Sequence, residues 1–263
     1  MQDNSPRKLS QIGVTSTVSL SKTFDIRLSR IFIIVAISLL IFLSWYYMFF
    51  GMTMNMKAVG LWNEGDLFSL FLMWAIMMAG MMLPSATPVI LLVEKLNFQR
   101  KVKQVAYAHS LYFVAGYLLA WVLYSALITL IQWGLHSVSL LSPMMLSRND
   151  VFSGVLLIIA GLYQWSPLKQ KCLQLCRTPL NMLTTQWREG INGAITLGFK
   201  HGQYCLACCW FLMALLFVTG VMNLKWILVL TLLVMVEKCL PRGDVMSKYI
   251  GCLLIVLGIV ILF

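Results

Sequence analysis

Charged residues are scarce in this chain of 263 residues, because Asp, Glu, Lys and Arg together make up only 11% of it. Soluble globular domains carry about 25% charged residues, and 60% of this chain is hydrophobic. The composition therefore excludes a water-soluble fold. Several runs approach the roughly 20 apolar residues that cross a bilayer, and such blocks are unlike the weak alternation of a membrane β-barrel. We expect an all-α, polytopic helical membrane protein.

Acidic residues are fewer than basic ones, 9 against 20, which gives a formal net charge of +11. The basic residues lie mainly in short segments between apolar runs and not along one face of a domain. This distribution follows the positive-inside rule of membrane proteins and does not indicate a surface for nucleic acid. We therefore expect the lipid bilayer as a partner and no nucleic acid.

The sequence also lacks a G-x-x-x-x-G-K-[ST] phosphate-binding loop and a cleavable signal sequence. A nucleotide-driven pump is therefore not expected, and any transport would be passive, coupled to an ion gradient or assisted by a partner. The first apolar run begins near Ile31, and we expect it to be retained as a membrane anchor.

Seven apolar runs follow a polar N-terminal tail, residues 1–30. They cover residues 31–50, 67–83, 105–133, 151–165, 205–221, 226–240 and 249–263. With the tail placed in the cytoplasm, only three of the 20 basic residues, Lys57, Arg148 and Lys225, fall in outer segments. We expect one integral membrane domain, residues 31–263, with about seven transmembrane helices, or six if the short last run does not span. A cysteine-containing loop at 166–200 would then be cytoplasmic, and Pro84 and Pro88 would break or kink the chain after the second run.

The seven cysteines are an odd number and do not have the pattern of a secreted disulfide framework. Cys205, Cys208 and Cys209 follow His201 at helical spacing, which places three thiols and an imidazole on one face of a helix. Cys172 and Cys176 are four residues apart in the 166–200 loop, and we expect one or both to join the same site. Thiolate and imidazole ligands suit Cu(I) or Zn(II). The alternative is that these cysteines are inert, since Cys is also a small hydrophobe.

Methionines form a second pattern of soft ligands. They alternate in the loop after the first run and continue at helical spacing in the second run, at Met52, Met54, Met56, Met73, Met77 and Met81. Thioethers select Cu(I), so these residues are candidates for an outer metal relay. The alternative is packing, because Met fills irregular gaps. Four further residues are candidates for a supporting role: His109, Glu237, His136 and Asp66. For Glu237, pairing with Lys238 or another basic residue at the interface is an equal alternative.

Several motifs, taken together and in order, resemble those of one bacterial family. They are Trp74-x2-Met77-Met78-Ala-x-Met81-Met82-Leu-Pro84-Ser85, Gly161-Leu-Tyr163-Gln, Pro167-Leu-Lys169-x2-Cys172-Leu-x2-Cys176-Arg, His201-Gly-x-Tyr204-Cys205-x2-Cys208-Cys209-Trp210 and Asn223-x2-Trp226. The family is a domain-of-unknown-function family described as predicted metal-binding integral membrane proteins. The resemblance covers nearly everything after about residue 45. It implies a single multi-span domain in the bacterial inner membrane, and it supplies no reaction.

These residues favour a protein that binds, relays or transports a soft transition metal, copper first, together with a metal-handling partner in the membrane or periplasm. One alternative is a membrane-embedded copper-dependent oxidoreductase or monooxygenase component, for which three histidines in the whole chain are few. The other is a non-catalytic membrane assembly partner. No catalytic residue is identified from the sequence, and an enzyme is the less favoured interpretation.

Overall fold

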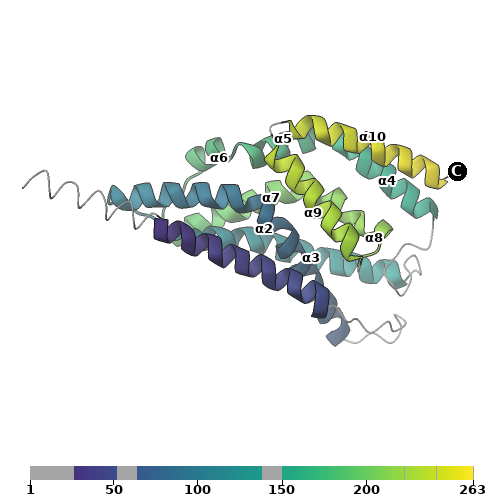
Figure 1. The fold of residues 1–263 in the computed structure, drawn as a ribbon, viewed down its shortest axis with the longest axis horizontal. Coiled ribbons are helices and arrows are strands. Elements are labelled where there is room, and N and C mark those ends of the chain that lie inside the picture. Colours follow the sequence, from purple (N-terminus) through teal and green to yellow (C-terminus); the bar gives the residue numbers. More distant parts are fainter. Residues whose placement is uncertain (1–26, 52–63, 138–149, 222, 241, 263) are drawn as a thin grey trace, which may run out of the picture.

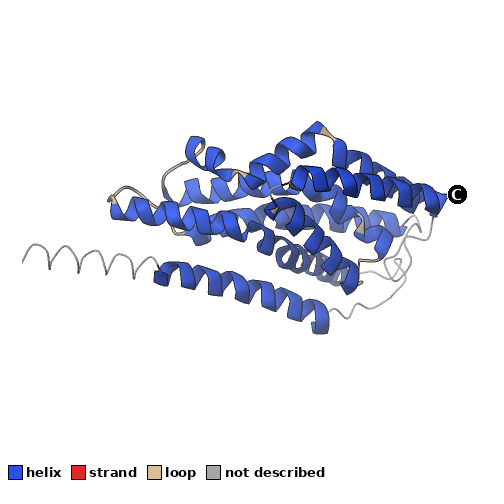
Figure 2. Ribbon diagram, turned by 45° about the horizontal axis from the view of Figure 1, so that its top comes forward, coloured by secondary structure: helices blue, strands red, loops and turns tan. Residues whose placement is uncertain are grey.

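The structure is a computed structural model, and it describes residues 27–51, 64–137, 150–221, 223–240 and 242–262. Within these ranges all regular structure is helical (Figure 2), which confirms the predicted all-α fold. The N-terminal helix Arg27–Gly51 ends in a π-helical turn, η1 (Tyr47–Gly51). The later helices are α2 (Glu64–Val102), α3 (Ser110–Ser137), α4 (Asp150–Trp165), α5 (Pro167–Arg177), α6 (Pro179–Thr185), α7 (Gly190–Ala214), α8 (Leu216–Thr219), α9 (Leu224–Cys239) and α10 (Gly243–Leu262).

Five of the described helices are long and apolar enough to cross a membrane: Arg27–Gly51, Gly65–Val102, Ser110–Leu135, Gly190–Thr219 and Gly243–Leu262. A sixth span is obtained if α4 and α5, which meet at an angle of 63°, form one broken crossing. The last run is longer than predicted, because α10 begins at Gly243. The sequence-based total of about seven also counts α9, whose 16 residues extend only about 24 Å.

The second helix does not end at the two prolines. α2 continues as a helix through Pro84 and Pro88 to Val102, so of the two predicted outcomes, a break or a kink, the break is wrong. Hydroxyl groups bond to backbone carbonyls at this point: Thr87 Oγ1 donates to the Leu83 carbonyl at 2.9 Å. Such side-chain hydrogen bonds, together with packing by neighbouring helices, let a membrane helix tolerate proline.

The range 166–200, predicted as a polar loop, is also mostly helical, since it contains α5, α6 and the first part of α7. Ser166 caps α5 by accepting a hydrogen bond from the Lys169 backbone N–H at 3.1 Å, and Pro167 follows as the first helical residue. One face of α5 is buried, and it carries Cys172 and Cys176. The polar composition of this segment therefore reflects an amphipathic helix with one exposed face and not a loop.

Two pairs of helices approach so closely that their backbones touch. α3 packs along α7, and α4 packs along α10 at the edge of the bundle (Figure 1). A Cβ added at Gly198 of α7 would lie 2.0 Å from the Phe113 carbonyl oxygen of α3, and one at Gly161 of α4 would lie 2.7 Å from the Gly251 carbonyl oxygen of α10. Small residues permit such contacts between membrane helices. The first contact fixes which face of α7 is turned toward α3.

Candidate metal centre

The thiols of α7 lie deep in the bundle. The sequence placed Cys205 at the start of a span, but α7 begins at Gly190, so Cys205 is about 22 Å further along the helix. Cys205, Cys208 and Cys209 are each 2% exposed or less. In the part of α7 that precedes the cysteines, the Gly198 backbone packs directly on α3.

α5 packs against α7 and brings two more thiols to it, those of Cys172 and Cys176. The Cys176 thiol lies beside the thiols of Cys205 and Cys208. Cys172 is also buried and lies near Cys208. We refer to these five buried cysteines, Cys172, Cys176, Cys205, Cys208 and Cys209, as the thiol cluster. The remaining two cysteines, Cys239 and Cys252, are exposed.

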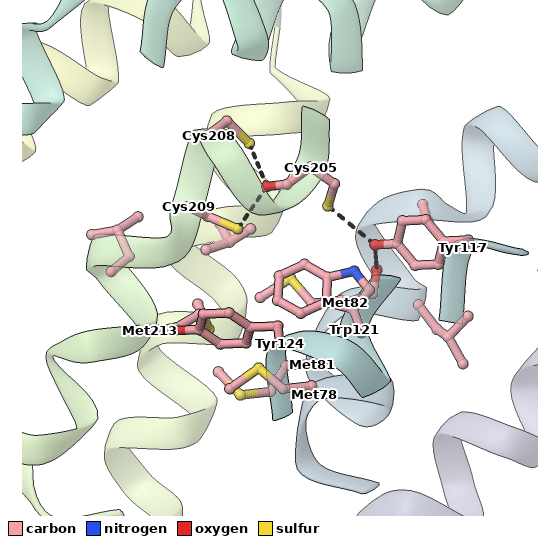
Figure 3. Packing of buried hydrophobic residues seen from close by; sticks show 14 of the residues in the cluster. Met78, Met81, Met82, Tyr117, Trp121, Tyr124, Cys205, Cys208, Cys209 and Met213 are labelled. Carbon is pink, nitrogen blue, oxygen red and sulfur yellow. Dashed lines mark hydrogen bonds between the residues drawn. The ribbon is translucent and has the colours of Figure 1, made fainter. Parts of the chain in front are cut away.

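Cys205 of α7 is linked by side-chain contacts to α9 and α3 and, through α3, to α2. Its Sγ accepts a hydrogen bond from Lys238 Nζ of α9 at 2.7 Å and lies 3.1 Å from the Tyr117 hydroxyl of α3. The same hydroxyl donates to the Met82 carbonyl of α2 at 3.2 Å, as Figure 3 shows. A buried positive charge beside sulfur attracts the thiolate, which is the form that binds metals. Cys205 therefore has the most polar surroundings in the thiol cluster.

The thiols of Cys208 and Cys209 are turned toward the backbone. Each donates to the Cys205 carbonyl oxygen at 3.0 Å (Figure 3). In the part of the chain that the structure describes, no group of three or more His, Cys, Asp or Glu side chains is arranged to hold a metal ion. To share an ion with other sulfur atoms, the thiols of Cys208 and Cys209 would have to give up their hydrogen bonds to this carbonyl.

His201 lies one helical turn before Cys205, as predicted, and is buried. Its ring packs against the rings of Phe113 and Tyr117, with 5.8 Å between centroids in both cases. Its Nδ1 atom is buried and makes no hydrogen bond with any described residue. Buried polar atoms nearly always have a partner. Of the thiol cluster, Cys205 and Cys208 lie near this imidazole, and thiols with an imidazole are the types of ligand that suit a soft ion such as Cu(I) or Zn(II).

The methionines of α2 belong to the same core as the thiol cluster. Met73, Met77 and Met81 are buried, and Figure 3 shows Met81 beside Met78 and Met213, close to the aromatic rings of Tyr124 and Trp121. The other three relay candidates, Met52, Met54 and Met56, lie outside the described residues.

The remaining candidates lie apart from this core or have other partners. His109 precedes α3, is exposed, and contacts the ring of Phe32 at 6.2 Å between centroids. Asp66 lies in the first turn of α2 and is half-buried. His136 is in the last turn of α3, and its side chain is outside the described part of the structure. None of the three is placed with the thiol cluster by a described contact.

Glu237 has a partner that the sequence did not identify. It is buried and forms an ion pair with Lys169 of α5, with 2.9 Å between Nζ and Oε2. Lys169 also donates to Gln164, which accepts a further hydrogen bond from Ser247 at 2.8 Å. Lys238 follows Glu237 directly but faces Cys205, because adjacent residues on a helix point about 100° apart. The sequence alone assigned no role to Lys169 or Tyr117 and did not connect Lys238 with the thiols. The available signals were the position of Lys169 in a motif with Cys172 and Cys176, and the Glu237-Lys238 pair at the end of an apolar run.

A family model matches most of the chain: the PpoB2 model, described as copper chaperone, covers residues 71–261. The match includes the whole thiol cluster, His201 and the methionines of α2. No curated protein and no solved structure matches the chain.

Proposed function

The chain belongs to the PpoB2 family, described as copper chaperone, and from this premise we propose that it is a membrane-embedded protein that binds Cu(I) and passes it on. The observation that carries this proposal is the burial of five thiols on two neighbouring helices, together with His201, whose Nδ1 has no hydrogen-bond partner among the described residues. The cargo would be held among the thiol cluster, with ligands from both α5 and α7.

The surroundings of the thiol cluster favour a soft ion over a hard one. The carboxylate nearest in sequence to Lys238, that of Glu237, is held by Lys169 and is not free to bind. Thiolate, thioether and imidazole ligands select Cu(I), whereas Mg²⁺ and Ca²⁺ need several oxygen ligands. The buried methionines of α2 could pass Cu(I) through the core without gaining or losing protons, because a thioether binds the ion in its neutral form. Met52, Met54 and Met56 would extend this relay outward.

Copper binding to the purified protein tests the proposal directly. We expect the protein, purified in detergent under reducing conditions, to bind about one Cu(I) per chain in competition with a Cu(I)-specific chelator, since a soft ligand set retains this ion. A C239S/C252S variant, which removes the two exposed cysteines, is expected to bind equally well. Wild-type protein that yields all of its copper to a weak chelator would refute the proposed function.

For the orientation we propose a cytoplasmic N-terminus in a bacterial inner membrane, with the short α9 as a seventh crossing. The start of the N-terminal helix and the end of α2 lie toward one end of the bundle, while the end of α3 and the C-terminus lie toward the other (Figure 1). This arrangement is consistent with the orientation inferred from the basic residues, since basic residues are concentrated on the cytoplasmic side of membrane proteins.

Cysteine labelling tests the orientation. In a cysteine-free background, single cysteines at Thr53 and Ser147 are expected to react with an impermeant reagent added to intact cells, because the segments carrying them hold few basic residues. A cysteine at Gln99 is expected to react only after the membrane is opened. Labelling of Gln99→Cys in intact cells, with Thr53→Cys and Ser147→Cys protected, would mean the opposite orientation.

A further inference from the structure

Three charged side chains are buried next to the thiol cluster, and their charges do not cancel. They are Lys169, Glu237 and Lys238. Lys169 and Glu237 neutralise each other in an ion pair of 2.9 Å. Lys238 forms no ion pair with any described carboxylate, and its Nζ instead contacts Cys205 Sγ at 2.7 Å and Ser85 Oγ at 3.4 Å. No described carboxylate therefore balances the charge of Lys238, and the groups beside it are the sulfur of Cys205 and a hydroxyl.

We propose that Lys238 is the counter-ion of the bound metal and that it fixes the charge of the complex to one Cu(I) held by two thiolates. This inference rests on the proposed copper-binding function and adds the number of ligands and the residue that sets it. On binding, two S–H bonds break, two Cu–S bonds form and two protons leave, with no change in oxidation state. The complex carries one negative charge, and the ammonium of Lys238 neutralises it.

The physical reason is the penalty for leaving charge unmatched in a dry interior. A buried ion without a partner is strongly unfavourable, and the attraction between opposite charges is stronger where water is excluded. A Cu(I) ion with three thiolates, or a Zn(II) ion with four, would carry two negative charges and leave one of them unmatched beside Lys238. Because five buried thiols are present, the number of thiolates bound to the ion would be limited by charge balance and not by the number of cysteines.

The contacts of Cys205 make it the first of the two ligands. It is the thiol that Lys238 touches. The thiols of Cys176 and Cys209 both lie beside it, so the second thiolate comes from the same cluster. The thiols that do not bind copper stay protonated and neutral. They can keep donating to backbone carbonyls, as Cys208 and Cys209 now do to that of Cys205.

Substitution of Lys238 tests the counter-ion role. K238M removes the charge and is expected to weaken Cu(I) binding by at least about tenfold in chelator competition, because it leaves the complex with an unmatched charge. K238R keeps a positive charge and is expected to retain most of the affinity. The matched control is K169M/E237Q, which removes a buried lysine and a buried carboxylate without changing the net buried charge, and it is expected to bind as wild type. Wild-type affinity in K238M, or an equal loss in K169M/E237Q, would overturn the proposal.

A measurement on the wild-type protein tests the number of thiolate ligands even if K238M does not fold. X-ray absorption of the copper-loaded wild type should show two sulfur ligands on copper, and three or four would refute the charge match. Wild-type protein that binds no copper at all would instead refute the proposed function. The two failures are therefore distinguishable.

Discussion

Replacing Cys205, Cys208 and Cys209 together by serine is expected to weaken Cu(I) binding by at least about 100-fold, since even indirect partners of a metal contribute about 10- to 100-fold. Serine keeps the present hydrogen bonds. A hydroxyl at positions 208 and 209 can donate to the carbonyl of residue 205, and one at position 205 can accept from Lys238. The substitution therefore removes the soft sulfur atoms and little else. Copper retained after chelator treatment, measured by elemental analysis, reports the effect.

Single substitutions on α5 refine the same experiment. Cys176→Ser should weaken binding more than Cys172→Ser, because the Cys176 thiol reaches both Cys205 and Cys208, whereas Cys172 only lies near Cys208. The C239S/C252S variant is the control for nonspecific thiol binding. If the triple serine variant retained its copper, or if the control lost as much, the thiol cluster would not be the binding site.

Replacing Lys169 by methionine is expected to lower the free energy of unfolding by about 3–5 kcal/mol, the usual effect of removing one partner of a buried ion pair. The side chains of Lys169 and Glu237 are only 1% and 2% exposed, so Glu237 would be left as a buried carboxylate without its cation. Thermal or denaturant unfolding in detergent, together with the yield of folded protein, measures this loss.

Two further variants test that explanation. Adding Glu237→Gln to Lys169→Met removes the stranded charge and should restore most of the stability, since a neutral replacement of a buried pair is often tolerated. Glu189→Gln, at the exposed Arg100–Glu189 pair, should change stability by at most about 1 kcal/mol. A Lys169→Met protein as stable as wild type, or a double variant no more stable than the single one, would contradict the assigned role of this pair.

Local patterns in the sequence were enough to predict the helical class and the shared face of the α7 thiols. Low charge and long apolar runs leave few alternatives to a bundle of membrane helices. The spacing of His201, Cys205, Cys208 and Cys209 predicts a common helix face, and all four side chains are buried in the structure. Both features depend on residues close together in the chain, where helical geometry alone fixes the outcome.

Features that depend on contacts between distant segments were not predictable in the same way. α5 was predicted to be a polar loop because its exposed face carries charge. The proximity of Cys176 to Cys205 depends on how α5 packs on α7. Lys238 and Glu237 are neighbours in sequence, but each has its partner on another helix. Which of these two adjacent charges faces the thiol cluster depends on the rotation of α9 about its own axis, and a single sequence does not contain that angle.

The two thiols turned onto the Cys205 carbonyl affect how long copper would stay bound. A ligand that must first be freed from another partner binds with an apparent affinity reduced by the fraction of time it is free. The net contribution of a hydrogen bond to stability is about 0.5–1.5 kcal/mol, and thiols are weak donors. Competition by the carbonyl would therefore lower the affinity of Cys208 or Cys209 for copper only severalfold. The same carbonyl offers each departing sulfur a ready acceptor as soon as it takes up a proton. The helix backbone would thereby shorten the residence time of the ion, which suits a carrier that must give up its cargo more than a store that must keep it.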